Sequence, residues 1–255
     1  MEVECIGNTQ IIHMEETGIT QRTIGLLAAE ITGSTKIFDV INERNCSDLA
    51  DFNLRFFGRG VGARLPGTPV LCGSVIAKGD TNSFTCYTIQ HHFGGWQEFV
   101  RMEGTRDNAA GIVYKNKFHV FGGLDNSRDT LRTSVIISRN GEVIDGPYLP
   151  IGIHGHAITT VNSSVSIISG GLKTLWFDIT NQTWYYNHET KKFTPGPPLH
   201  RARTYHGSAT IIDRMTKVKI PVVTGGYRDK KGSTELLIKG QWQTGTYYSM
   251  QKAKC

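Results

Sequence analysis

The sequence has no apolar run long enough to cross a membrane as a helix. Of its 255 residues, 38% are hydrophobic and 20% are charged. Its apolar stretches, such as residues 26–29 and 220–223, are far shorter than the roughly 18 apolar residues that a membrane helix needs. The first residues include acids, whereas a secretory signal peptide has basic residues and then a long apolar segment. We therefore expect no membrane association and a cytoplasmic protein, with secretion as the alternative if the N-terminus is incomplete.

Motifs of catalysis and cofactor binding are missing as well. There is no Gly-x-Ser-x-Gly elbow, Walker loop or dinucleotide fingerprint, so a hydrolase or a nucleotide-dependent enzyme would lack its nucleophile or its phosphate cradle. His91 and His92 are adjacent and would point to opposite faces of a strand. His154 and His156 would share a face, but neither pair has the further ligands that a metal site needs. We expect no catalytic residue, no metal and no cofactor.

Positive charge is in slight excess but is not concentrated. There are 28 Lys and Arg residues against 22 Asp and Glu, which gives a net charge of +6. The densest groups are Lys191-Lys192 and Arg228 with Lys230-Lys231. A nucleic-acid-binding face needs a clustered basic stripe that follows the phosphate backbone, so we expect no nucleic acid partner.

Glycine is abundant, with 29 residues, and it marks an internal repeat. An apolar run ends on Gly-Gly at Gly122, Gly170 and Gly225, and weaker copies end at Gly33 and Gly73. Successive copies are 40, 49, 48 and 55 residues apart. A period near 50 residues is typical of the four-stranded blades of a propeller. Glycine suits the ends of such strands because it permits close backbone approach and conformations that a β-carbon would forbid.

Between the glycines, short β-rich runs alternate with turns. In the copy at Gly122, residues 109–113 and 118–121 are predicted strands on either side of a tight turn. Residues 133–138 and 142–145 are predicted to form a hairpin closed by an Asn-Gly pair, which favours a type I′ turn. No amphipathic helical pattern stands out. The sequence therefore predicts an all-β protein.

Aromatic and proline positions within this repeat resemble the kelch repeat. After Gly-Gly there is an aromatic residue, then a tryptophan or phenylalanine, then Pro or Arg before the next copy. The fourth copy shows this pattern at Gly170-Gly171, Tyr186, Phe193, Pro197-Pro198-Leu199 and residues 203–207. The resemblance extends from about Thr23 to Thr246. Residues 45–52, with the segments 71–73 and 86–87, are similar to small stand-alone kelch proteins.

The resemblance implies a fold and its boundaries. It implies an all-β, kelch-type β-propeller of about five four-stranded blades over residues 23–246, either a five-bladed ring or an incomplete six-bladed one. Residues 1–22 would be an N-terminal segment that adds one or two closing strands to the last blade, or else a loose tail. Residues 247–255 would be a C-terminal tail.

The resemblance also implies a function. Kelch propellers bind partner proteins on a loop face, and in ubiquitin-ligase receptors of the family a basic residue opening each blade lines a central pocket for acidic peptides. Arg106 and His154 each lie 16 residues before their Gly-Gly pair. Arg203 heads the corresponding strand of the last copy, and Arg55 lies near the same position of an earlier one. We predict that these residues bind acidic segments of a protein partner through charge-assisted hydrogen bonds. In the alternative, the arginines stack on neighbouring aromatic side chains and cap the blade edges.

Two further functions stand beside a non-catalytic protein-interaction scaffold, which is the first choice. An extracellular glycan- or matrix-binding propeller could stack sugars on tryptophans such as Trp96, Trp176 and Trp184, provided that they are exposed. A diverged enzyme is the other alternative, because copper radical oxidases and sugar-acid epimerases have kelch-like propellers.

Cysteine pairing has two open interpretations. The five cysteines leave at least one unpaired within the chain. Cys72 ends one predicted strand and Cys86 begins the next, so an antiparallel hairpin could bring their Cα atoms within the roughly 4.4–6.8 Å of a disulfide. In a reducing compartment the two would be buried thiols instead.

Overall fold

The computed structural model describes residues 10–15, 23–28, 35–39, 44–49, 56–57, 60–66, 68–73, 75–76, 85–89, 96–213, 216–227 and 233–245. All regular secondary structure in these residues is β-strand. No helix in this part of the chain could span a membrane. The 22 strands found there form five four-stranded antiparallel sheets and one small two-stranded sheet.

The strands enter the sheets in chain order. The first sheet contains β1 (Gln10–Glu15), β2 (Thr23–Ala28), β3 (Thr35–Asp39) and β4 (Arg44–Leu49). The second contains β6 (Val61–Leu65), β7 (Thr68–Cys72), β9 (Thr85–Ile89) and β10 (Trp96–Arg101), while β5 (Phe56–Phe57) pairs with β8 (Val75–Ile76) beside it. The third contains β11 (Ala110–Tyr114), β12 (Lys117–Phe121), β13 (Ser134–Ser138) and β14 (Val143–Asp145). The fourth contains β15 (Ala157–Thr160), β16 (Val165–Ser169), β17 (Thr183–Asn187) and β18 (Lys192–Pro195). The fifth contains β19 (Gly207–Ile212), β20 (Lys219–Thr224), β21 (Thr234–Ile238) and β22 (Gln241–Gly245).

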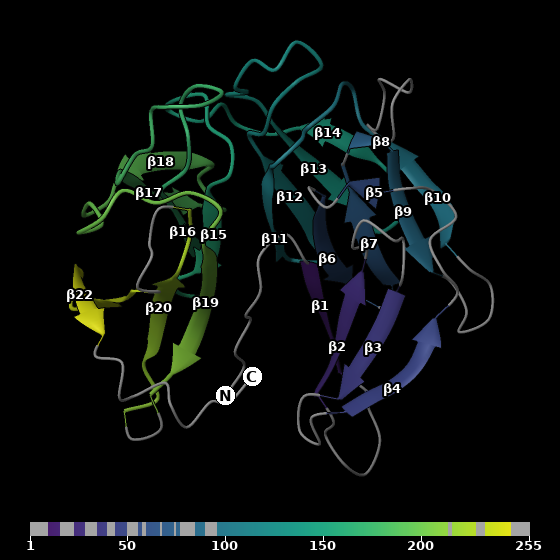
Figure 1. Cartoon of the computed structure of the whole chain (residues 1–255), viewed down its shortest axis with the longest axis horizontal. Helices are drawn as coiled ribbons and strands as arrows, with labels where there is room; N and C mark the ends of the chain where they lie inside the picture. The colour runs from purple at the N-terminus through teal and green to yellow at the C-terminus, as the bar shows by residue number, and fades with distance from the viewer. Residues whose placement is uncertain are drawn as a thin grey trace.

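The five sheets follow one another round an arc, as the blades of a propeller do (Figure 1). The first strands of consecutive sheets lie next to one another, since β1 contacts β6, β6 contacts β11, β11 contacts β15 and β15 contacts β19. The sheets of β1 and β19 stand at the two ends of the arc, and their described strands make no contact of comparable extent. The all-β propeller with four-stranded blades that the sequence predicts is confirmed, with five such sheets in the described residues.

The N-terminal segment differs from its prediction. β1 lies within residues 1–22 and pairs with β2 along its whole length, from Gln10 opposite Ala28 to Glu15 opposite Thr23. These six residues therefore form an edge strand of the first sheet, and the prediction that they close the last blade is wrong. The propeller begins before residue 23, and the predicted tail at residues 247–255 lies outside the described residues.

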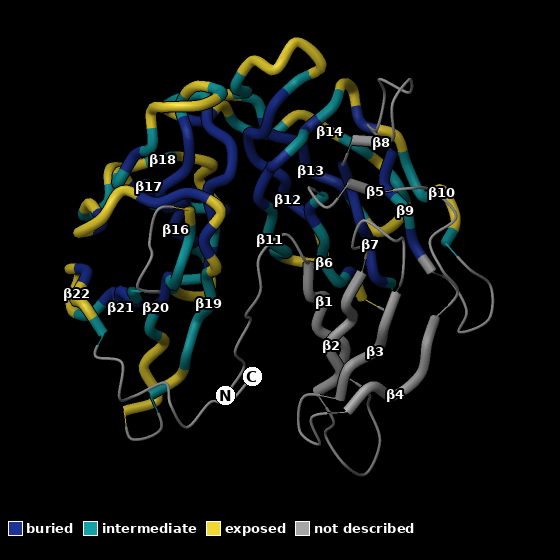
Figure 2. Tube along the Cα trace, in the orientation of Figure 1, coloured by how far each residue is buried: buried dark blue, intermediate teal, exposed yellow. Residues whose placement is uncertain are grey.

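The apolar core lies between consecutive sheets, where the tube of Figure 2 is dark blue. Residues 118–121 of β12 and residues 134–137 of β13 are all buried, because neighbouring sheets cover both faces. Such strands appear in the sequence as continuous apolar runs rather than as an alternation. Three clusters hold the last four sheets together. Phe118 and Ile137 pack with Val61 and Val70, Phe121 packs with Ile168 and Tyr186, and Ile167 packs with Val223 and Trp242.

The Gly-Gly pairs lie where the backbone of the next sheet comes closest. Gly122 and Gly170 both have φ +59°, and a β-carbon on either would stand closer than 3.0 Å to a backbone oxygen of the next sheet's leading segment, that of Ile153 or of Arg203. Gly225 of the fifth sheet has φ +66° but no described atom within 4 Å of that position. At Gly122 and Gly170, both the positive φ and the close packing favour glycine, whereas at Gly225 only the positive φ does.

Candidate functional site

Arg106 is buried at the start of the third sheet and bonds within that sheet. It is 4% exposed. Its Nη1 donates to the backbone oxygens of Gly122 (3.1 Å) and Thr133 (2.8 Å), and its Nη2 donates to the Thr133 hydroxyl at 2.8 Å. Burial lowers the pKa of Arg106 to about 10, so the guanidinium remains charged at neutral pH. The side chain ties the Gly-Gly turn of its own sheet to the loop before β13.

Arg203 repeats this arrangement in the fifth sheet and adds an ion pair. It is 0% exposed. Its guanidinium donates to the backbone oxygens of Gly225 (2.8 Å) and Ser233 (3.1 Å) and to the carboxylate of Glu235 at 2.7 Å. Glu235 is 1% exposed and also accepts a hydrogen bond from the backbone N–H of His200 at 2.7 Å. Both charges are therefore neutralised inside the protein.

The predicted basic pocket is not built from these residues. Both guanidinium groups are buried and bonded within their own sheets, so neither is available to an acidic peptide. This corrects the prediction that Arg106 and Arg203 bind acidic segments of a partner. As in the alternative interpretation, the two arginines cap the blade edges. They do so through backbone carbonyls and a carboxylate, and not by stacking on aromatic rings. Arg55 lies outside the described residues.

His154 is displaced by one residue from the arginine position. Isolated bridges pair Asp107 with Leu124, His154 with Leu172, and Thr204 with Tyr227. His154 therefore corresponds to the residue after each arginine, and Ile153 occupies the arginine position. The His154 ring is buried, and its Nε2 lies 3.2 Å from the backbone oxygen of Thr174. It therefore supports the loop after β16 and does not line an open pocket.

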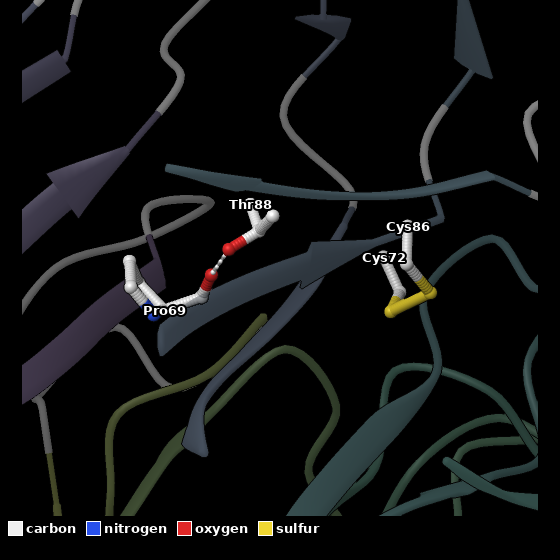
Figure 3. The surroundings of a disulfide bond; sticks show 4 residues. All are labelled: Pro69, Cys72, Cys86 and Thr88. Atoms are coloured by element: carbon white, nitrogen blue, oxygen red, sulfur yellow. Dashed lines mark hydrogen bonds between the residues drawn. A yellow bond between two sulfur atoms is a disulfide. The ribbon is translucent and has the colours of Figure 1, made fainter. Parts of the chain in front are cut away.

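Cys72 and Cys86 face each other across the second sheet (Figure 3). They form a disulfide between β7 and β9, with Cα atoms 4.0 Å apart, and both residues are fully buried. Two residues further along the pairing, the Thr88 hydroxyl donates to the backbone oxygen of Pro69 at 2.8 Å. Of the two interpretations of the sequence, the structure has the disulfide.

Two buried histidines fill the space beside the Gly-Gly turns. Carbon Cε1 of His156 would be 3.0 Å from a β-carbon on Gly122, and that of His206 would be 2.8 Å from one on Gly170. His206 Nε2 bonds the Ser169 hydroxyl at 3.0 Å. Burial lowers the pKa of both imidazoles to about 3, with repulsion from neighbouring cationic groups adding to it, so both are neutral at physiological pH. This Ser–His contact is enclosed within the blade packing, where no substrate can reach it.

A second group of histidines lies between the third and fourth sheets. His188 stacks on Tyr114 with ring centroids 4.3 Å apart and meets His119 edge-on at 5.1 Å. Its Nε2 bonds the Ser166 hydroxyl at 2.8 Å. Burial lowers the pKa of both histidines to about 4. Among the residues that the structure describes, neither group has the three or more His, Cys, Asp or Glu side chains of a metal site.

Large aromatic side chains are exposed at one end of the fourth and fifth sheets. Trp176 is 63% exposed and Phe177 is 82% exposed, both on the loop between β16 and β17. Tyr205 precedes β19 and Tyr227 follows β20, and they are 42% and 63% exposed. We call these four residues the aromatic loop surface. Sequence reasoning named only Trp176 among them, as one of three tryptophans that could stack on sugars if exposed.

The aromatic loop surface is connected through buried contacts. The loop of Trp176 is held by His154, whose ring lies 6.2 Å from that of Tyr205. Thr204, next to Tyr205, bridges to Tyr227 through a 2.8 Å backbone hydrogen bond. Trp184, in contrast, is 8% exposed and belongs to the core between the third and fourth sheets.

Comparison with known proteins shows the fold. No family model matches the chain, and no curated protein matches it. Many solved structures do match. One of them, described as "Structure of YjhT", aligns with a TM-score of 0.73 and 10% sequence identity over 94% of this chain and 84% of that chain. At this identity the likeness shows a β-propeller and nothing finer, so membership of the kelch family stays a prediction from the sequence.

Proposed function

We propose that this chain is a kelch-type propeller that acts as a non-catalytic protein-interaction module and binds partner segments on its aromatic loop surface. The observation that carries this proposal is the exposure of Phe177 and Trp176, 82% and 63%, on a loop held by buried contacts. Binding residues concentrate on loops that a rigid scaffold positions. Exposed aromatic side chains gathered in one place are typical of protein-binding surfaces.

The chemistry of the buried groups supports a binding role. The two Ser–His contacts, Ser169 with His206 and Ser166 with His188, lie within the packed sheets. A general base must reach a substrate, and these imidazoles are neutral groups whose ring nitrogens face the interior. Arg203 and Glu235 are likewise engaged with each other. The polar interior therefore serves the blades, and the exposed loops are what a partner can contact.

Affinity capture with quantitative mass spectrometry tests the proposal. The wild type is compared with a variant carrying Trp176→Ser and Phe177→Ser. Removal of two central aromatic anchors is expected to cost about 2 kcal/mol or more, a loss of roughly 30-fold in affinity. Ile212→Ser is the matched control, because Ile212 is 58% exposed at the opposite end of the fifth sheet. The proposal fails if the proteins captured by the wild type are retained equally by the loop variant.

Glycan binding is a second candidate, favoured by the exposure of Trp176. An exposed indole can stack on a sugar ring. Iodide quenching and oligosaccharide titration of tryptophan fluorescence, in the wild type and in Trp176→Phe, separate the two functions. A spectral shift with oligosaccharide that disappears in the variant favours a glycan ligand. The same titration without a shift, together with captured proteins, favours the interaction module.

A further inference from the structure

A groove lies between the fourth and fifth sheets, at the end opposite to the aromatic loop surface. Its volume is about 650 Å³. The turns β15–β16, β17–β18, β19–β20 and β21–β22 all lie at this end, since each strand of an antiparallel sheet reverses direction. The lining comes from both sheets and includes Val165, Tyr185, Lys192, Lys219, Pro221 and Lys239.

The charged part of the groove is entirely basic. Lys192, Lys219 and Lys239 line it, all three are exposed, and none forms an ion pair with a residue that the structure describes. No carboxylate is among the described residues that line it. The acidic residue nearest in sequence to the lining residue Thr190 is Glu189, and it is paired with Lys115 of the third sheet at 3.4 Å. Three lysines from two sheets therefore share one opening.

The floor of the groove is apolar. Val165, Pro221 and Leu237 contribute to the lining from the central strands. Val218, on the turn after β19, is 56% exposed beside them. Tyr185 is half-buried in the same wall, and burial raises the pKa of its phenol, so it remains a neutral hydrogen-bond donor.

We propose that this groove binds an extended acidic segment of another protein, with an apolar side chain of that segment on the floor and its carboxylates at the three lysines. The mixed lining decides the ligand class. A sulfated glycan or a nucleic acid would meet the lysines but would leave the aliphatic floor without a partner, whereas a peptide can supply both. This surface is separate from the aromatic loop surface, and the inference does not rest on the function proposed above.

Fluorescence anisotropy with a defined probe tests the inference. The probe is a fluorescein-labelled octapeptide that carries Leu-Phe between two runs of three acidic residues, and the matched probe has Asn and Gln in place of the acids. We expect the wild type to bind the acidic probe at least tenfold more tightly than the neutral one. Reversing two rim charges with Lys219→Glu and Lys239→Glu is expected to weaken binding by tenfold or more, since each exposed charge pair contributes up to about fivefold. Val218→Ser is expected to weaken it by about threefold through lost apolar contact.

The control variant carries Lys117→Glu and Arg139→Glu. It makes the same change in net charge on exposed residues of the third sheet, away from the groove. Equal losses in this variant and in the groove variant would overturn the inference, because they would reveal attraction to net charge alone. Absence of binding up to 1 mM probe, or tighter binding of a heparin octasaccharide than of the peptide, would overturn it as well. The Trp176→Ser, Phe177→Ser variant should bind the probe unchanged, which keeps the two surfaces experimentally distinct.

Discussion

The buried ion pair of the fifth sheet allows a sharp energetic prediction. Arg203 and Glu235 have side chains that are 1% and 2% exposed, with their charged atoms 2.7 Å apart. Removing one partner of such a pair leaves the other charged and buried, which costs about 3–5 kcal/mol. Arg203→Met and Glu235→Gln should therefore each lower the free energy of unfolding by about that amount.

The double variant should cost much less than the sum. With both charges gone, the penalty of an uncompensated buried charge disappears. What remains of the cost is the loss of the Arg203 hydrogen bonds to Gly225 and Ser233, since a glutamine at position 235 can still accept from the His200 N–H. We expect a coupling free energy of at least about 2 kcal/mol between the two positions. Arg106→Met is the matched control. Its guanidinium bonds to carbonyls and a hydroxyl with no carboxylate in contact, so its loss should cost about 1–3 kcal/mol.

Urea unfolding followed by tryptophan fluorescence measures these energies. Trp242 is 3% exposed in the same sheet, and its indole N–H donates to the backbone oxygen of Pro197 at 3.0 Å, so its emission reports unfolding of the fifth sheet. If the two single variants add to the double within about 0.5 kcal/mol, the positions are not coupled. That result would refute the reasoning, as would an Arg106→Met cost equal to that of Arg203→Met.

Three further predictions concern stability. Gly170→Ala should cost at least about 2 kcal/mol more than Gly240→Ala, because both have positive φ but only Gly170 has a backbone oxygen closer than 3.0 Å to the new carbon; equal urea midpoints would contradict the packing argument. His156 and His206 are neutral when folded and titrate near pH 6.5 when unfolded, so the unfolded state binds more protons between about pH 6.5 and pH 3. As the pH is lowered through that window, the free energy of unfolding should decrease by about 1.4 kcal/mol per histidine per pH unit, or by about 4 kcal/mol for the pair at pH 5. A flat profile of unfolding free energy from pH 7 to pH 5 would count against it. Reducing the disulfide of the second sheet, whose cysteines are 14 residues apart, should cost about 3 kcal/mol through loop entropy, and identical urea curves with and without dithiothreitol would show otherwise.

The repeat made most of the fold predictable from the sequence. The glycine period and the β-rich runs between the glycines define the sheets around Gly122, Gly170 and Gly225. In the copy at Gly122 the strands lie within a residue or two of their expected positions. The strand within residues 1–22 was assigned to the wrong sheet. This strand pairs with β2 of the first sheet. A local sequence pattern can predict a strand, but it carries no information about which sheet edge the strand will join.

The candidate site was less predictable, because counting residues does not follow the backbone. A spacing of 16 residues placed His154 at the arginine position, but the third and fourth sheets differ by one residue there, and Ile153 occupies it. The groove could not be predicted from the sequence for another reason. Lys192, Lys219 and Lys239 lie on three different strands or turns of two sheets, and only the packing of those sheets brings them to one opening.

Corresponding interior positions in successive sheets are filled by different pairs of side chains. Where the fifth sheet has Arg203 and Glu235, the fourth has Ile153 and Trp184, two members of one apolar cluster. An ion pair and an apolar pair thus fill the same interior position. This is expected of a position whose role is to pack the interior and to pair its buried charges, and not to take part in a reaction. The terminal nitrogens of Arg203 already donate to Gly225, Ser233 and Glu235, and the side chain is fully buried, so neither nitrogen is directed outward. The two proposed binding surfaces therefore use exposed side chains at the blade ends, the aromatic residues at one end and the lysines at the other.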